Sequence, residues 1–150
     1  MTRGEQVLTH RFVSFVPEKL EDGVVYVAIE HATVVHRCAC GCGEEVVTPL
    51  SPTDWRLMFD GESISLEPSI GSWSLPCRSH YWITRNRVHW APSWTQDRID
   101  AGRLYDQVTK ANYFSERSSE ALRSADQVEA RGMPEATRQS FWSRWLIVRR

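Results

Sequence analysis

The sequence predicts an α+β protein: a small, mostly antiparallel β-domain with a zinc site, built as a sandwich or open barrel, followed by a helical C-terminal tail. Three observations predict this fold. Short strand-like segments separated by turn residues fill residues 1–92, a spacing typical of such β-domains. Helical periodicity follows in residues 93–150, and three of the four cysteines lie between Cys38 and Cys42. We therefore divide the chain into a zinc-containing β-domain, 1–92, and a helical tail, 93–150.

The strand candidates are short apolar or alternating runs. Asp60-Gly61 separates two of them and is a strong hairpin signal, because glycine tolerates the positive φ of a two-residue turn. A second hairpin is expected around Thr84–Arg87. The candidates are Arg11–Val16, Val24–Ile29, Ala32–His36, Val46–Thr48, Trp55–Phe59, Ser63–Leu66, Tyr81–Ile83 and Val88–Trp90.

The tail is predicted to form three helices. Ser93 or Thr95 would cap the first. Its apolar face comprises Ile99, Leu104, Tyr105, Val108 and Ala111. Ser115 would cap the second helix and Gly132 would end it, while Pro134 suits the first turn of the third. The third helix carries an apolar stripe of Phe141, Trp142, Trp145 and Leu146. Such a stripe either docks onto the β-domain or forms a partner or oligomer surface.

The composition excludes several classes of function. The 150 residues include 18 basic and 19 acidic side chains, a net charge of −1, so the chain has no overall attraction to nucleic-acid phosphates. The longest apolar runs are far shorter than the roughly 18 residues of a membrane span. The first residues are polar and do not resemble a secretory signal. We expect a cytoplasmic protein that binds neither nucleic acid nor membranes.

The cysteines predict a zinc site. Zinc is held by about four thiolate or imidazole ligands. Cys38, Cys40 and Cys42 alternate along the chain, so in an extended segment they would face one point. Cys77 and His80 would complete the site. These five candidates compete for four places: either one cysteine is spare, or the four cysteines bind the metal and His80 is free. A site filled by four protein ligands is structural, because no position is open for water.

Two serines and two histidines near the cysteines are candidates for hydrolytic chemistry. A serine nucleophile requires a base within hydrogen-bond reach, often with a third group that orients the base. Ser69 or Ser79 could be the nucleophile, and His36 or His80 the base. The orienting carboxylate could come from Asp54 or Asp60.

The tryptophans cluster in the same part of the chain. Four of them, Trp55, Trp73, Trp82 and Trp90, either fill the core of the β-domain or line a groove for an extended peptide. We favour the core, where most tryptophan area is buried.

Five segments resemble a bacterial family of domains of unknown function. They are P-E-K-L-E-D-G-V-V-Y-V from Pro17, H-R-C-A-C-G-C-G from His36, V-V-T-P-L-S-P-T-D-W from Val46, D-G-E-S-I-S-L-E-P-S-I-G-S-W from Asp60 and C-R-S-H-Y-W-I from Cys77. Members of that family accompany ubiquitin-like proteins and E1-like and E2-like enzymes in conjugation operons linked to antiphage defence. The resemblance covers roughly residues 11–92.

The resemblance implies a peptidase that acts on ubiquitin-like proteins. It carries over no confirmed catalytic residue. The candidates that match motif positions are His36, Cys38, Cys40, Cys42, Ser69, Cys77, Ser79 and His80. It implies a ubiquitin-like protein or its conjugates as partner, and E1-like or E2-like enzymes as further partners.

We therefore expect a hydrolase, a serine-type protease with a structural zinc, that processes or removes a ubiquitin-like protein (deconjugation). The extended C-terminal tail of the modifier would lie across a strand edge or a Trp-lined groove. Ser69 or Ser79 would attack, with His36 or a metal-free His80 as base, and backbone N–H groups near Gly71 would stabilise the oxyanion. Two alternatives stay open: a zinc hydrolase with a catalytic metal, and a non-catalytic adaptor that binds the modifier or its conjugating enzymes.

Overall fold

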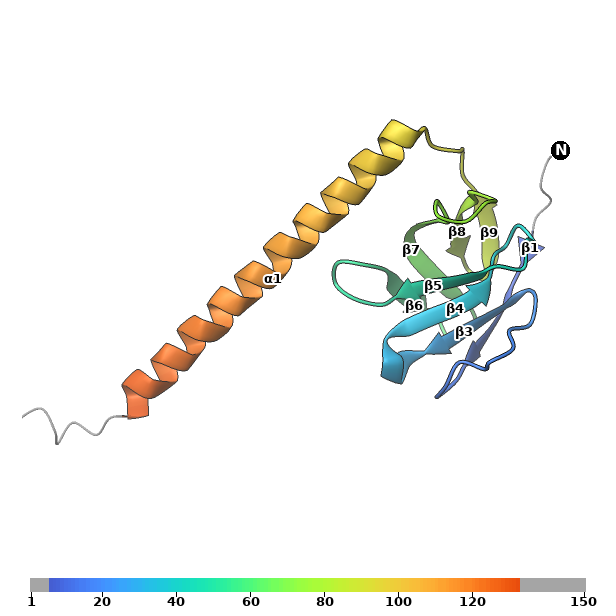
Figure 1. Ribbon diagram of the computed structural model, residues 1–150. Coiled ribbons are helices and arrows are strands. Elements are labelled where there is room, and N and C mark those ends of the chain that lie inside the picture. The colour runs from blue at the N-terminus through green and yellow to red at the C-terminus, as the bar shows by residue number, and fades with distance from the viewer. Residues whose placement is uncertain (1–5, 133–150) are drawn as a thin grey trace, which may run out of the picture. The chain divides into compact units, whose positions relative to one another are not determined.

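Two β-sheets pack against each other in the computed structural model, which describes residues 6–132 (Figure 1). The five-stranded sheet has the order β1 (Gln6–Val7), β9 (Arg87–Trp90), β8 (His80–Thr84), β7 (Ile64–Gly71) and β6 (Arg56–Phe59). The four-stranded sheet has the order β2 (Thr9–Phe12), β3 (Val24–Ala28), β4 (Thr33–Arg37) and β5 (Glu45–Pro49). A short 3-10 helix, η1 (Ile29–His31), joins β3 to β4. All described strand pairs are antiparallel except β2 with β3, so the predicted α+β class is confirmed.

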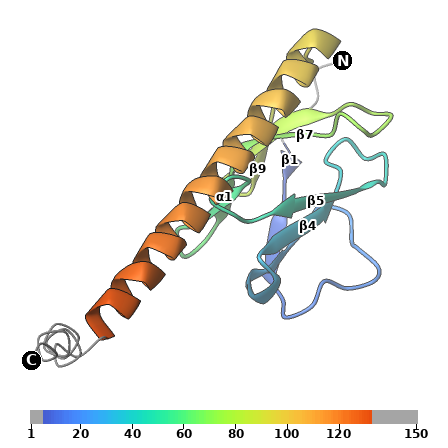
Figure 2. The ribbon, with the colours of Figure 1, turned by 60° about the vertical axis from the view of Figure 1, so that its left-hand side comes forward.

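The core lies between the sheets because their strands alternate in polarity. On β7 and β8, Leu66 and Ile83 point inward and are fully buried, whereas their sequence neighbours are more polar or exposed. Val27 and Val34 meet them from the four-stranded sheet. Both faces of β3 are buried, because a second cluster around Tyr26 covers its outer face. Figure 2 shows β4 and β5 running side by side within this sheet.

The two predicted hairpins are confirmed. β6 and β7 join through residues 60–63, where Gly61 has a φ of 99°. β8 and β9 join through Arg85 and Asn86, which have φ values of 49° and 62°. The values at Arg85 and Asn86 match the positive φ that a two-residue turn of this kind requires.

Three strands differ from the prediction. β1 (Gln6–Val7) lies outside all the predicted segments, and two others have different bounds. The strand expected over Arg11–Val16 is β2 and ends at Phe12, so the residues that follow leave the sheet to cover β3. β7 continues from the predicted Ser63–Leu66 segment through Pro68 to Gly71. Segments rich in proline, serine and glycine favour turns, and here the tertiary structure overrides that tendency.

The described part of the tail is one helix, α1 (Gln96–Gly132). Thr95 caps it, as predicted, with its Oγ1 accepting a 3.4 Å hydrogen bond from the Arg98 backbone N–H. The predicted break at Ser115 is wrong: the Ser115 hydroxyl donates to the Asn112 carbonyl at 2.9 Å within the helix. Serine in a helix often bonds the preceding turn in this way. The third helix, predicted from Pro134, lies outside the described residues.

The chain divides into two compact units between Asp106 and Gln107. The division at residue 92, drawn from composition, stays a prediction. On the apolar face expected for the first helix, only Ile99 is buried, and Leu104 and Val108 are exposed. Neither helical segment within residues 6–132 combines the length and apolarity that crossing a membrane requires.

Asp60 stabilises the hairpin between β6 and β7. Its carboxylate accepts hydrogen bonds from the backbone N–H groups of Glu62 and Ser63 and from the Ser63 hydroxyl, and these bonds lower its pKa to about 2. We expect Asp60→Ala to lower the Tm at neutral pH. A depressed pKa contributes stability above the unfolded value of about 3.9, which is lost as the pH falls towards 2. Thermal unfolding of both proteins between pH 7 and pH 2 should show their difference shrinking below pH 4. A constant difference contradicts this role.

Candidate active site and cysteine cluster

An irregular stretch of β7 places Ser69 on the outer face of the five-stranded sheet. Leu66 pairs with Ile83 and Ile70 pairs with Tyr81, so the three intervening residues of β7 lie opposite one residue of β8. One of the three is Pro68, which lacks the N–H that a regular ladder needs, and the Glu67–Pro68 peptide bond is cis. This arrangement brings the Ser69 side chain to the face that carries His80.

Ser69 and His80 form a hydrogen-bonded pair. The distance from Ser69 Oγ to His80 Nε2 is 3.0 Å, and the distance from His80 Nδ1 to the Pro92 carbonyl oxygen is 2.9 Å. A carbonyl oxygen only accepts hydrogen bonds, so Nδ1 carries the proton. In the neutral imidazole Nε2 is then unprotonated and accepts from the Ser69 hydroxyl. This is the tautomer that a base acting on Ser69 needs.

Three tryptophans surround the His80 ring. The ring centroids of Trp73 and Trp94 each lie 5.0 Å from it, and that of Trp82 lies 5.6 Å away. They leave His80 only 5% exposed although it is on the outer face of the sheet. The packing holds the imidazole in one orientation and removes water from around it. Trp82 itself is 39% exposed.

The segment after β9 completes this aromatic enclosure. Trp94 stacks on Trp73 with an interplanar angle of 23°. The Arg98 guanidinium lies 4.3 Å from the centre of the Trp94 ring, a favourable cation–π distance. Gly102 lies beside the same ring, where a Cβ atom would be 3.5 Å from Trp94 Cζ3, an ordinary van der Waals distance. The first turns of α1 therefore hold Trp94 against His80.

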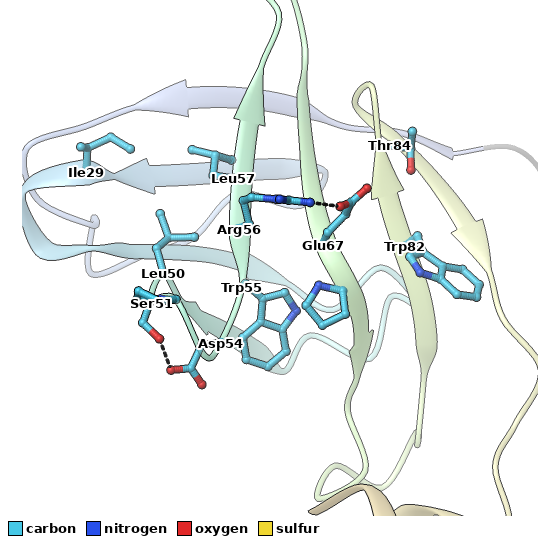
Figure 3. Close-up of a pocket in the computed structure, with 12 residues that line it drawn as sticks. Ile29, Leu50, Ser51, Asp54, Trp55, Arg56, Leu57, Glu67, Trp82 and Thr84 are labelled. Atoms are coloured by element: carbon cyan, nitrogen blue, oxygen red, sulfur yellow. Dashed lines mark hydrogen bonds and ion pairs between the residues drawn. The ribbon is translucent and has the colours of Figure 1, made fainter. Parts of the chain in front are cut away.

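A wide groove adjoins the site (Figure 3). It has a volume of about 940 Å³, and its lining includes Trp55, Pro68, Trp82 and Thr84. Two of its lining residues, Arg56 and Glu67, form an ion pair at 2.7 Å. Pro68, one of the residues that line the groove, immediately precedes Ser69 in the chain.

The four cysteines gather at one point. Their sulfur atoms all lie within 4.8 Å of one another; Sγ of Cys38 is 3.4 Å from that of Cys40 and 3.8 Å from that of Cys77. In tetrahedral zinc with Zn–S bonds of about 2.3 Å, sulfurs are roughly 3.8 Å apart. The donor set thus fits a zinc ion.

Local backbone geometry builds this cluster. Cys38, Cys40 and Cys42 lie in a loop after β4, in which Gly41 and Gly43 both have a φ of 82°. Only glycine adopts such values readily. The Cys38 N–H donates to the Glu44 carbonyl at 2.8 Å and closes the loop.

The surroundings of Cys38 and Cys40 shift the pKa values of their thiols in opposite directions. Burial raises the pKa of Cys38. Burial also opposes ionisation of Cys40, but the Ser79 side chain and the Cys42 backbone beside its sulfur outweigh this effect and lower the Cys40 pKa. A thiol that ionises readily beside other thiols suits a metal ligand, because the thiolate is the binding form.

His36 lies in the core between the sheets. It is 1% exposed, and its Nε2 is 2.8 Å from the Tyr81 hydroxyl oxygen. Burial lowers its pKa to about 4, so it is neutral near pH 7. Its Nδ1 has no hydrogen-bond partner among the described residues.

The structure thus shows which of the candidate serines and histidines lie close to each other and which do not. Ser69 meets His80, whereas Ser79 is buried beside the cysteine thiols. No hydrogen bond joins His36 to either serine within the described residues. His80 was one of five possible metal ligands; both its ring nitrogens have other partners, and the four-cysteine cluster forms without it.

Sequence reasoning missed two parts of the site. The third position, expected to hold Asp54 or Asp60, is taken at His80 Nδ1 by the carbonyl of Pro92. A backbone oxygen has no sequence signal. Trp94 was not among the four tryptophans for which the sequence predicted a place. Of the tryptophans expected in the core, Trp55 and Trp90 pack against it, and the others enclose His80.

Gly71 is required where β7 passes under Trp73. A Cβ atom at this position would lie 2.3 Å from Trp73 Nε1. We expect Gly71→Ala to lower the free energy of unfolding by about 1–3 kcal/mol, the usual cost of overpacking. In a Trp73→Ala background the same substitution should cost less, because the obstructing ring is gone. Urea unfolding of the four proteins measures this coupling, and equal costs in both backgrounds argue against the contact.

Comparison with known proteins gives one family. Residues 12–91 match the family model described as "Bacterial ubiquitination-like system serine protease (BubE)". Neither the curated proteins nor the solved structures include a match. The family agrees with the resemblance seen in the sequence motifs. Because the match spans more than half of the chain, this protein belongs to the BubE family of serine proteases from bacterial ubiquitination-like systems.

Proposed function

We propose that this protein is a serine protease in which Ser69 is the nucleophile and His80 the general base, acting on a ubiquitin-like protein. The observation that carries the proposal is the 3.0 Å hydrogen bond between Ser69 Oγ and His80 Nε2. The bond from His80 Nδ1 to the Pro92 carbonyl supports it, because it selects the required tautomer. The family match supports the reaction class.

The proposed reaction proceeds through an acyl-enzyme. Ser69 Oγ attacks the scissile carbonyl carbon as its proton moves to His80 Nε2, which becomes an imidazolium. The Pro92 carbonyl stabilises that cation through the Nδ1–H bond. His80 then gives the proton to the leaving amine, the C–N bond breaks, and the acyl group stays on Ser69. Water, deprotonated by His80, hydrolyses this ester and restores the serine.

We assign stabilisation of the oxyanion to backbone N–H groups near Gly71. The Ser72 N–H donates to the Ser79 carbonyl at 2.8 Å, towards β8. Because successive residues of a strand direct their N–H groups to opposite sides, the Gly71 N–H points away from β8. It is therefore positioned to bind something other than the neighbouring strand.

The substrate we propose is the extended C-terminal tail of the ubiquitin-like protein, as a precursor or in conjugates. The wide groove beside Ser69 supports this assignment, since it is open and lined in part by exposed aromatic surface at Trp82. The same role would place the protein beside E1-like and E2-like enzymes in an antiphage conjugation pathway.

We assign the cysteine cluster to a structural zinc ion held by Cys38, Cys40, Cys42 and Cys77. When bound, the ion would supply a cross-link between the loop after β4 and the segment that enters β8 at His80. Four thiolates leave no position for a water ligand, which disfavours the alternative of a catalytic zinc hydrolase. The non-catalytic adaptor is the remaining alternative.

We expect Ser69→Ala to lower kcat/KM for cleavage of a ubiquitin-like precursor by about a thousandfold or more, because it removes the nucleophile. His80→Gln should have a similar effect. Ser79→Ala is the matched control and should retain cleavage, since Ser79 is buried beside the thiols. The assay follows release of the C-terminal extension by mass spectrometry.

The alternatives give different results in the same assay. Unchanged cleavage by Ser69→Ala would falsify the serine mechanism. Reversible loss of turnover on chelation, without unfolding and without inhibition by serine-directed reagents, supports a catalytic metal. Binding of the precursor without cleavage at high protein concentration supports the adaptor.

We expect one zinc ion per chain by metal analysis. Cys77→Ser should release it and lower the free energy of unfolding by about 4 kcal/mol or more, as loss of a structural metal typically does. Ser69→Ala is the control: it should keep the full zinc content while losing activity. Purified protein without metal, or a Cys77→Ser variant of wild-type stability, contradicts the assignment.

A further inference from the structure

β7 has a free edge beside Ser69. β6 pairs with β7 only as far as Arg56 with Glu67, whereas β7 itself continues to Gly71. Before Arg56 the chain turns towards the other sheet, where the Trp55 N–H donates to the Pro49 carbonyl at 3.1 Å. Residues 68–71, which we term the free edge, therefore have β8 on one side, and none of the strands within residues 6–132 pairs with their other side.

A narrow hollow lies along this free edge. It has a volume of about 160 Å³ and is lined by Gly71 and Ser74 on one side and by Val46 and Thr48 of β5 on the other. β5 is the edge strand of its own sheet. The hollow is thus bounded by two strand edges. Because the Ser72 N–H donates towards β8, the N–H and carbonyl of Gly71 point the other way, to the side of β7 on which the hollow lies.

Ser69 lies between this narrow hollow and the wide groove. Pro68 lines the groove and Ile70 lines the hollow, so the residues on either side of Ser69 open onto different spaces. Trp55, which Figure 3 shows in the lining of the groove, also lines the hollow, so the two spaces share that side chain. The hollow has about one sixth of the volume of the groove, with 160 Å³ against 940 Å³.

We infer that the substrate binds as a short strand antiparallel to the free edge of β7, with small residues before the scissile bond in the narrow hollow and residues of any size after it in the wide groove. This inference rests on the proposed function. An extended peptide gains affinity from main-chain hydrogen bonds to an open strand edge, and antiparallel pairing is the more stable arrangement. β7 runs from the groove to the hollow, so an antiparallel substrate runs from the hollow to the groove. The acyl portion is thereby confined to the smaller space.

The packing of the residues that line the two spaces explains why only the narrow hollow would select substrate residues by size. Trp73 lies against Gly71, and Val46 and Thr48 are buried parts of the core, so the hollow cannot widen without disturbing packed side chains. The groove is bordered by exposed residues such as Trp82 and Thr84. The protein would therefore select small side chains before the scissile bond and accept side chains of different sizes after it.

The test uses the full chain and synthetic ten-residue peptides analysed by mass spectrometry. The four residues before the central bond are either glycine and alanine or leucine and phenylalanine, and the four after it vary in the same way. We expect kcat/KM to be at least about tenfold higher for small residues before the bond, with little dependence on those after it. Backbone N-methylation of the residues before the bond should lower cleavage by a similar factor.

Two variants test the narrow hollow and the wide groove separately, and a third is their control. Ser74→Trp fills the narrow hollow and should lower kcat/KM for every peptide by about tenfold or more. Thr84→Trp narrows the wide groove and should affect mainly peptides with large residues after the bond. Ser119→Trp, at an exposed position of α1, is the matched control and should leave cleavage unchanged. Labelling of Ser69 by a small fluorophosphonate reagent should be equal in all three.

The outcomes distinguish the two proposals. If large residues before the bond are cleaved as fast as small ones, or if N-methylation has no effect, the strand-pairing inference is wrong while the serine mechanism stands. If no peptide and no ubiquitin-like precursor is cleaved, or if the reagent labels Ser69→Ala as it labels the wild type, the proposed function itself fails.

Discussion

The alternation of side chains along β8 is the constraint on which the rest of the protein depends. Tyr81 points into the core and meets His36 across the two sheets. His80 and Trp82, one residue to either side, point to the opposite face. One strand therefore contributes both to the packing that stabilises the sandwich and to the site that contains Ser69. A shift of β8 by one residue would exchange the two faces, so the core fixes the register in which His80 can meet its serine.

The cysteine cluster constrains the same strand from its beginning. Cys77 lies three residues before His80, and its sulfur meets that of Cys38 from the loop after β4. The loop and the strand belong to different sheets. The cluster therefore joins the sheets at the end of β8 where the histidine lies. With the hydrogen bond between His36 and Tyr81, it limits sliding of one sheet over the other.

Much of this arrangement could be predicted from the sequence, and the exceptions have physical causes. Hairpins such as Asp60-Gly61 are local, because the turn residues alone select the geometry. The membership of the cysteine cluster was also predictable, but the extended segment expected to form it was wrong. Cys38, Cys40 and Cys42 lie in a loop, and its turns at Gly41 and Gly43 bring the thiols together. The path of β7 past Pro68 was not predictable, because proline and glycine signal a turn and only pairing with β8 keeps the segment extended. The contact between Ser69 and His80 depends on that irregular path. The sequence could therefore name both residues as candidates but could not select this pair from the possible serine–histidine pairs.

The oxygen that orients His80 belongs to a peptide group and not to a side chain. Every amino acid carries that oxygen, so no substitution at position 92 can delete it; only a change in the course of the chain can move it. In the proposed mechanism, therefore, three groups act, but only two of them, Ser69 and His80, are side chains. The third is the Pro92 carbonyl. The matched family segment stops at residue 91, one position short of the third. The family match and the set of groups that act in the proposed mechanism therefore end at different positions on the chain.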